Sequence, residues 1–400
     1  MTTQLLVAGM FRSGTTLLSN LLSDHPNGLV VSDPFVYFFK QYRNFHLAKL
    51  GLSDWKEDEP TPDYFGGVRG ELLESLQAGD LQEQIPADAL RQLITEIRKW
   101  KSEQHPGLCD RLDEIQAGTF AEVYQALMQL AVELYGDDQL QVAGTKVSWC
   151  EEFLPAMARA FPEMRFVLPV RDLRAIVASQ NSQRGIGEGC RPLLFYVRHW
   201  RKSVALAQYY SEQHPLLKER VTLVRYEDLV HAPDKTMALI MEHVGLTAHS
   251  LAVTADASGR THNSSFNHDA QGVFTGSAER WRGVLSADEI KAIEAFAGPE
   301  LLLLGYKLAT AVKRPLECLG LDCEPRFDEV SSWLQPFPAA AYLRDSAARD
   351  NEYTLEERRR EVLDGGELRS ATEERELFLV NGLLSKLRRA WSARTDLDQH

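Results

Sequence analysis

A short glycine loop near the start of the chain constrains the fold more than any other feature. Residues 9–16 (Gly-Met-Phe-Arg-Ser-Gly-Thr-Thr) follow an apolar run at 5–8 and precede leucines that recur at helical spacing over 17–22. A loop between a buried strand and a helix directs backbone N–H groups into one concavity, and the helix N-terminus adds partial positive charge. The sequence therefore predicts an anion-binding loop that opens an α/β fold with a parallel sheet.

The spacing of the glycines is that of a P-loop, but the cation has a different position. Four residues separate Gly9 from Gly14, and Thr15 stands where a nucleoside-triphosphate-binding loop has its lysine. The basic side chain of this loop is Arg12. Two other hypotheses stay open at this point, a P-loop kinase of a small molecule, which needs that lysine and a strand-end aspartate for Mg²⁺, and a non-catalytic module that binds a nucleotide.

A second junction between a predicted strand and a helix carries another arginine. Residues 165–170 are predicted to form a strand, and Arg171 leaves its end, where ligands bind in open α/β sheets. Ser179 lies eight residues further on, about two helical turns, so its hydroxyl can face the same pocket. A third predicted strand, 221–224, is followed shortly by Tyr226.

These motifs together resemble the superfamily of sulfotransferases that use 3′-phosphoadenosine-5′-phosphosulfate (PAPS). The string Phe-Arg-Ser-Gly-Thr-Thr-Leu-Leu resembles the family's 5′-phosphosulfate loop, in the Arg form of the tyrosylprotein and many bacterial enzymes. The resemblance implies a sulfotransferase that consumes PAPS and releases adenosine 3′,5′-bisphosphate. It implies that the phosphosulfate end is held by Arg12, Ser13, Gly14, Thr15 and Thr16.

The resemblance also assigns the other end of the nucleotide. Arg171 and Ser179 match the family's 3′-phosphate motif, and Tyr226 is the counterpart of the tyrosine that contacts the adenosine. Ser265 begins the segment 265–281, which ends at Trp281 and resembles the loop closing over the 3′-phosphate. In that segment the sequence departs from the family, because Gln271-Gly272 stands where a Lys or Arg-Lys-Gly is usual.

Sulfuryl transfer resembles phosphoryl transfer, so catalysis rests on charge stabilisation, leaving-group assistance and proton removal. Arg12 is the candidate for the first role. Lys146, expected at the end of a strand that starts at Val142, is the candidate for the second, since the tyrosylprotein enzymes have a comparable lysine. Asp33 follows the predicted strand 29–32 and is the candidate base, where those enzymes have a glutamate. The alternatives are an exposed loop lysine and an Asp-Pro turn.

Three histidine or aspartate positions compete with Asp33 for the role of base. Asp24 and His25 come at the end of the first predicted helix and are expected to act as a helix stop. His199 lies inside a long predicted helix, 193–212, and is expected in the core. Nothing in the sequence calls for a metal.

Charge bears on the acceptor and on other partners. Residues 51–140 contain 19 Asp and Glu against 7 Lys and Arg, and this net of −12 is almost the whole formal charge of −13. Such a chain is a poor candidate for binding nucleic acid or an anionic membrane. The acidic segment favours a neutral or cationic small acceptor with a hydroxyl or amine, such as a sugar or secondary metabolite. The alternative is a solvated helical face.

The remaining sequence predicts organisation and location. We expect an α/β domain over 1–310, with a helical insertion at 41–139, and a charged helical extension over 311–400 with helices at 352–362 and 371–391. The extension could pack on the core, pair with a second subunit in a homodimer, or fray. No apolar stretch approaches the roughly 18 residues of a membrane span. The start of the chain leaves no room for a signal peptide and the five cysteines are scattered, so we expect reduced thiols in a cytoplasmic protein.

Overall fold

Apolar runs form the parallel sheet at the centre of the molecule. The computed structural model describes residues 2–32, 34–52, 68–179, 193–249, 275–310 and 346–397. Within these residues five strands lie in the order β2-β3-β1-β4-β5, and every neighbouring pair is parallel. The strands are β1 (Thr3–Gly9), β2 (Gly28–Ser32), β3 (Val142–Ser148), β4 (Arg165–Val170) and β5 (Val221–Arg225). The predicted α/β fold is confirmed.

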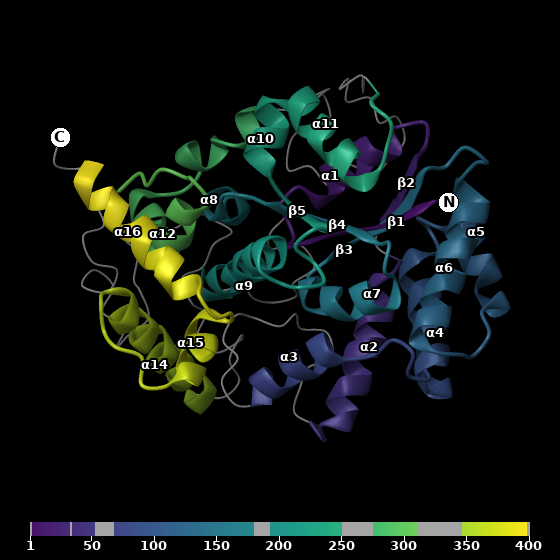
Figure 1. Ribbon diagram of the computed structural model, residues 1–400, viewed down its shortest axis with the longest axis horizontal. Coiled ribbons are helices and arrows are strands. Elements are labelled where there is room, and N and C mark those ends of the chain that lie inside the picture. Colours follow the sequence, from purple (N-terminus) through teal and green to yellow (C-terminus); the bar gives the residue numbers. More distant parts are fainter. Residues whose placement is uncertain are drawn as a thin grey trace.

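Both faces of the sheet are buried, as the continuous apolar runs require. Leu5 and Val7 of β1 face one core cluster, and Leu6 and Ala8 face the other. Figure 1 shows helices α1, α10 and α11 on one side of the strands and α7 and α9 on the other. The helices that come after β1, β3, β4 and β5 along the chain are α1 (Thr15–Ser23), η2 (Glu151–Phe153), α7 (Leu154–Ala160), α8 (Leu173–Val177), α9 (Leu193–Glu212), α10 (Tyr226–His231) and α11 (Pro233–Val244).

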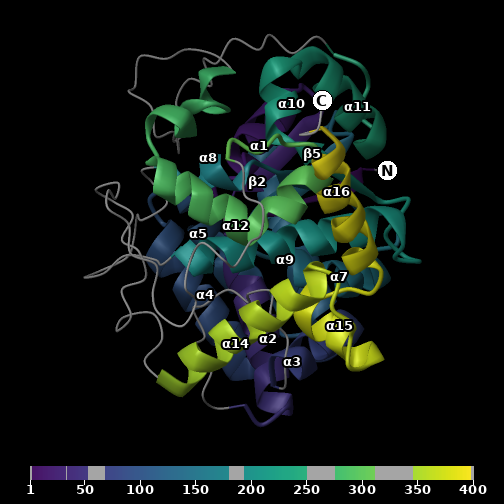
Figure 2. The ribbon, with the colours of Figure 1, turned by 90° about the vertical axis from the view of Figure 1, so that its left-hand side faces the viewer.

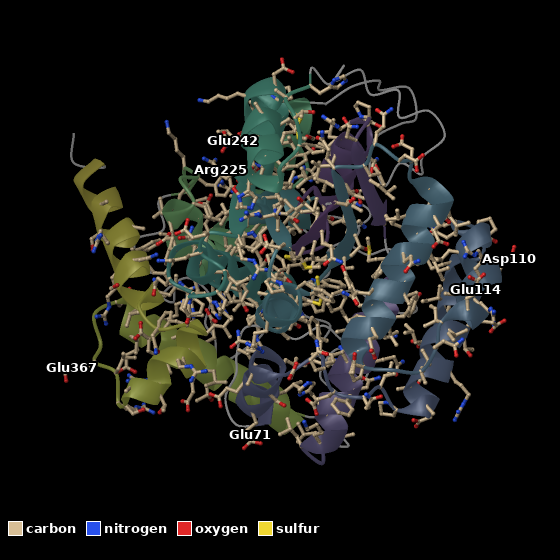
Figure 3. All side chains as sticks on the ribbon, turned by 45° about the vertical axis from the view of Figure 1, so that its right-hand side comes forward. Glu71, Asp110, Glu114, Arg225, Glu242 and Glu367 are labelled. Atoms are coloured by element: carbon tan, nitrogen blue, oxygen red, sulfur yellow. The ribbon has the colours of Figure 1, made fainter. Side chains whose placement is uncertain are left out.

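The described residues between β2 and β3 are mainly helical, as the sequence predicts. Thr119 caps the start of its helix α6: the Thr119 side chain accepts from the N–H of Glu122, while the Glu122 carboxylate accepts from the Thr119 N–H. Asp110 and Glu114 are exposed and project from the edge of the molecule (Figure 3), so part of the acidic segment is a solvated face. The helices are α2 (Val36–Lys49), α3 (Val68–Ala78), α4 (Ala87–Lys101), α5 (Pro106–Arg111), η1 (Leu112–Glu114) and α6 (Phe120–Tyr135).

The C-terminal helices pack on the rest of the chain. Helix α16 lies beside α12, and α14 and α15 contact α16 (Figure 2). Leu377 and Leu387 are buried in the same core cluster as the sheet. Glu356 of α14 pairs with Arg201 of α9 at 2.9 Å. The elements after β5 and α11 are η4 (Thr275–Ser277), η5 (Arg280–Gly283), α12 (Ala287–Leu303), α14 (Ser346–Leu363), α15 (Ala371–Phe378) and α16 (Leu383–Leu397).

One helix prediction is wrong in this region. The sequence pattern predicts a single helix from 371 to 391, but the structure has two, because Leu379 and Gly382 adopt positive φ angles of 71° and 80° that interrupt it. Among the described residues, none of the helices has the length and apolar character needed to cross a bilayer. The division into domains and the oligomeric state stay predictions.

Candidate active site

The glycine loop joins β1 to α1 at the carboxyl edge of the sheet. Gly14 has a φ of 94°, and a Cβ atom there would lie 2.4 Å from Cδ2 of Tyr226. Ser13 Oγ donates to the carbonyl of Met10 at 2.6 Å, which holds the loop closed from inside. No side chain of the described residues caps the start of α1. Its first backbone N–H groups, those around Thr15 and Thr16, therefore suit an anion.

Arg12 and Ser179 lie together although they are 167 positions apart in the sequence. The Nε of Arg12 donates to Ser179 Oγ at 2.9 Å. The sequence predicts two helical turns that carry Ser179. In the structure α8 ends earlier, at Val177, and Ser179 lies just after it. The serine nevertheless faces the loop, as the spacing predicts.

Arg171 connects the loop with two further elements. Its guanidinium lies 4.1 Å from the centre of the Tyr226 ring. Nη1 donates to the carbonyl of Arg12 at 3.1 Å, and Nη2 donates to the carbonyl of Ser277 at 2.7 Å. The buried Nε makes no hydrogen bond with any described residue. The structure thus brings Arg12, Arg171, Ser179 and Tyr226 to one place.

Ser277 is a residue of this cluster that the sequence reasoning missed. Its Oγ lies 2.7 Å from the hydroxyl of Tyr226, and its carbonyl accepts from Arg171. It belongs to the short helix η4, four residues before the buried Trp281. That tryptophan was a usable signal, since the segment that resembles the closing loop extends from 265 to 281.

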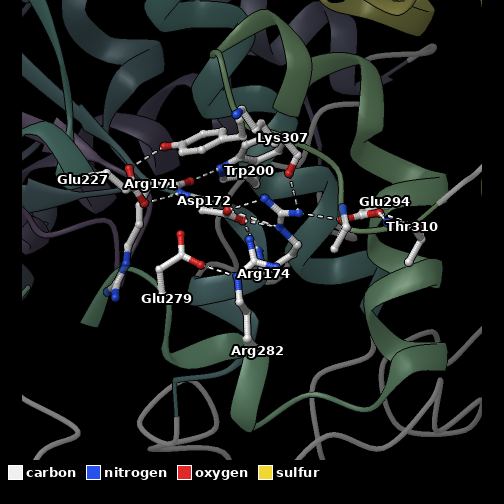
Figure 4. Close-up of polar contacts among 12 residues, drawn as sticks. Arg171, Asp172, Arg174, Trp200, Glu227, Glu279, Arg282, Glu294, Lys307 and Thr310 are labelled. Carbon is white, nitrogen blue, oxygen red and sulfur yellow. Dashed lines mark hydrogen bonds and ion pairs between the residues drawn. The ribbon is translucent and has the colours of Figure 1, made fainter. Parts of the chain in front are cut away.

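A buried ionic network supports the strand end that carries Arg171 (Figure 4). Arg174 pairs with Asp172 at 2.6 Å and with Glu294 at 2.5 Å. Glu227 accepts from the backbone N–H of Asp172, and burial raises the pKa of its carboxyl group. The indole of Trp200 donates to the carbonyl of Arg171 at 2.8 Å. These contacts fix the backbone at the end of β4 and leave the Arg171 side chain on the loop side.

Lys146 lies inside β3, where the sequence predicted the end of a strand. It is paired with Val7 on one side and Ser32 on the other, and β3 continues to Ser148. Its side chain is buried, so the alternative of an exposed loop lysine is wrong. The apolar pattern misplaced the strand end because it stops at the first charged residue, whereas this lysine is held within the sheet.

The other candidates divide into two groups. Asp33 and Ser265 lie outside the described residues. His25 follows the end of α1, with Nδ1 accepting from the N–H of Asn27 at 3.0 Å, which agrees with the expected helix stop. His199 is buried in α9, and its Nδ1 lies 2.7 Å from the carbonyl of Phe195.

Comparison with known proteins gives one family match and several similar folds. A profile of the sulfotransferase family matches residues 4–250. The sulfotransferase domain from the curacin biosynthetic pathway is 16% identical, with 77% of this chain and 99% of that chain covered and a TM-score of 0.45. The sulfotransferase domain of the Synechococcus PCC 7002 olefin synthase is 19% identical, with 74% of this chain and 95% of that chain covered and a TM-score of 0.43. Retinol dehydratase in complex with androsterone and the inactive cofactor PAP is 13% identical, with 74% of this chain and 80% of that chain covered and a TM-score of 0.37. A search of curated proteins found no match.

Proposed function

This chain belongs to the sulfotransferase family, and from that premise we propose that it transfers the sulfuryl group of PAPS to a hydroxyl or amine of a small-molecule acceptor. One observation carries the choice of donor. The two phosphate motifs converge, with Arg12 on Ser179 and Arg171 on the backbone of the glycine loop. A nucleotide with phosphate groups on both the 3′ and the 5′ position of its ribose needs two such neighbouring sites.

The residues present fit PAPS. The uncapped start of α1 offers backbone N–H groups for the 5′-phosphosulfate. The buried Arg171 Nε lacks a hydrogen-bond acceptor among the described residues, a cost that a 3′-phosphate would remove. Tyr226 lies against Gly14 on one side and Arg171 on the other, a suitable position for contact with the adenosine.

When bound, PAPS supplies the sulfuryl group: the acceptor atom bonds to sulfur while the bond from sulfur to the 5′-phosphate oxygen breaks. Arg12 and the loop N–H groups stabilise the charge on the group in transfer. Lys146, on the strand next to β1, assists the departing phosphate oxygen. Asp33 accepts the proton that the acceptor loses, and Ser265 belongs to the loop over the 3′-phosphate.

We also retain three finer proposals. The acceptor is neutral or cationic, in accord with the acidic residues 51–140. The enzyme is of the bacterial type and acts in the cytoplasm, in accord with free thiols at Cys109 and Cys150. Residues 1–310 form the catalytic domain, with 311–400 as an extension through which the chain forms a homodimer.

Titration with adenosine 3′,5′-bisphosphate tests the proposed function. We expect micromolar binding by isothermal calorimetry, about tenfold or more weaker in Arg12→Ala and in Arg171→Ala, because each change removes a charge-assisted contact. The matched control is Arg369→Ala, whose side chain is 74% exposed, and it should bind as the parent does.

Three results would point elsewhere. A preference for Mg·ATP over the bisphosphate would favour the kinase. Tight binding with no turnover of PAPS on any acceptor would favour the non-catalytic module. No binding at all would refute the proposed function.

A further inference from the structure

Two buried arginines from different helices contact the same carboxylate. Arg201 of α9 and Arg360 of α14 both pair with Glu356, which lies one helical turn before Arg360. Arg201 Nη2 donates to one carboxylate oxygen of Glu356 at 2.9 Å, and Arg360 Nε donates to the other at 2.9 Å. Each of the three side chains is at most 2% exposed. These three residues, which we call the Arg360 cluster, therefore carry one more positive than negative charge in a place sealed from water.

The neighbouring ion pair does not offset this charge. Arg359, the next residue of α14, pairs with Glu300 of α12, and the pair is neutral as a unit. Burial is the main cause that lowers the pKa of Arg360 to about 10. The positive charges of Arg359 and Arg201 act in the same direction, and the carboxylate of Glu356 opposes them. Arg360 still carries its proton at neutral pH, so a buried cation here calls for a further negative charge.

The far end of the Arg360 guanidinium shows where that charge belongs. Nη1 and Nη2 of Arg360 are buried and make no hydrogen bond with any described residue. The Phe296 ring of α12 has its centre 5.8 Å from the guanidinium carbon, and an aromatic face replaces neither an acceptor oxygen nor a counter-ion. Buried donors without an acceptor are unfavourable, and in folded proteins they mark the place of a bound water or ion.

We propose that the Arg360 cluster binds a small monovalent anion of the halide class, such as chloride, against Nη1 and Nη2 of Arg360. One negative charge balances the excess of one positive charge, whereas a divalent sulfate would reverse it. A water molecule would satisfy the N–H groups but leave the charge uncompensated. The anion joins α14 to α9, so it stabilises the docking of the C-terminal helices on the rest of the chain. This inference does not depend on the proposed function, because it concerns the stability of the fold.

Equilibrium unfolding in urea tests the proposal. Because the site is buried, the anion binds as the chain folds, and chloride then stabilises the folded state by mass action. We compare sodium chloride with sodium gluconate at equal ionic strength, since gluconate is monovalent but too large for a sealed site. At a chloride concentration about ten times the dissociation constant, the ratio of folded to unfolded protein should be about tenfold higher than in gluconate.

Two substitutions on α14 separate the site from general salt effects. Arg360→Met removes the excess charge and the N–H groups but keeps a long side chain, so the difference between chloride and gluconate should vanish. Arg358→Met is the matched control. Arg358 contacts the carboxylates of Glu361 and Glu373, so its charge is already balanced, and its removal should leave the response to chloride as in the parent.

A crystallographic measurement on the parent protein repeats the test without any variant, in case Arg360→Met does not fold. Crystals grown in sodium bromide should show an anomalous peak within hydrogen-bond distance of Arg360 Nη1 and Nη2. Absence of that peak would overturn the inference. An equal response of the parent to chloride and gluconate would also overturn it, since water would then be the partner of these N–H groups, and so would a chloride response that persists in Arg360→Met.

Discussion

Replacement of Gly14 by alanine should damage both the fold and the nucleotide site. The φ of 94° at Gly14 is unfavourable for any residue with a Cβ atom, and that atom would lie 2.4 Å from Cδ2 and 3.0 Å from Cε2 of Tyr226. The tyrosine cannot easily move aside. Its hydroxyl lies 2.7 Å from Ser277 Oγ, and the guanidinium of Arg171 covers its ring.

The stability lost in Gly14→Ala has two contributions of similar size. A left-handed backbone conformation costs an alanine about 1–2 kcal/mol relative to glycine. Overpacking of a well-ordered site typically costs about 1–3 kcal/mol, because neighbouring side chains are forced out of their rotamers. Gly14→Ala should therefore lower the free energy of unfolding by about 2–5 kcal/mol. Because Tyr226 contacts Arg171, displacement of the ring should also weaken binding of adenosine 3′,5′-bisphosphate.

Urea denaturation and calorimetry measure these two effects, and Gly51→Ala is the matched control. Gly51 has a φ of 67°, and a Cβ atom there would have no atom of the described residues within 4 Å beyond its chain neighbours. Alanine therefore bears the backbone cost alone, about 1–2 kcal/mol. Adding Tyr226→Ala to Gly14→Ala should abolish the excess over Gly51→Ala. If Gly14→Ala costs no more than Gly51→Ala and leaves bisphosphate affinity intact, the reasoning about the contact with Tyr226 is wrong.

Two further predictions concern the stability of the fold. Glu356→Gln removes the buried carboxylate that pairs with Arg201 and Arg360, so it should lower the free energy of unfolding in urea by about 3–5 kcal/mol. Glu357 is exposed on the same helix, and Glu357→Gln should leave that free energy almost unchanged. Equal effects of the two substitutions would contradict this prediction. Burial lowers the pKa of His46 from 6.5 to about 4, so between these values the unfolded chain binds a proton that the folded chain does not, and stability falls as pH falls. The loss from pH 7 to pH 5 is about 2 kcal/mol, and His46→Gln should remove it; an unchanged pH dependence would refute the assignment.

The local parts of the fold could be predicted from the sequence. An apolar run followed by a glycine loop is a short-range signal, and it located β1, the loop and α1 correctly. The same logic placed Arg171 at the end of β4. What failed depends on long-range packing: Lys146 lies within the sheet because β1 and β2 flank it, and no local pattern shows this. Ser277 reaches the site because η4 folds back over Tyr226. The resemblance of residues 265–281 to the closing loop pointed to this region, but it did not show which residue makes the contact.

The break between α15 and α16 illustrates the same limit. Leu379 carries no breaker signal, yet it adopts a positive φ, and its side chain is buried in the core. The energy gained by burying leucines on both sides of the break outweighs the preference for a continuous helix. The dipeptide Asn381-Gly382 was a local sign of a turn within that stretch, but it does not locate the break at Leu379.

The strong negative charge of the chain does not oppose a site for a polyanionic nucleotide, because screening limits the field of distant charges to about 10 Å. Asp110 and Glu114 are exposed at the edge of the molecule (Figure 3).

At the site itself, the contacts of each arginine determine whether its positive charge is already neutralised by the protein. The charge of Arg174 is balanced by Asp172 and Glu294. Arg171 instead contacts two carbonyl oxygens and an aromatic ring, none of which carries a net charge, so its full positive charge remains to attract a phosphate. Arg171 and Arg174, three positions apart, thus differ in their ability to attract a phosphate, and this difference favours Arg171 as the residue that binds the nucleotide.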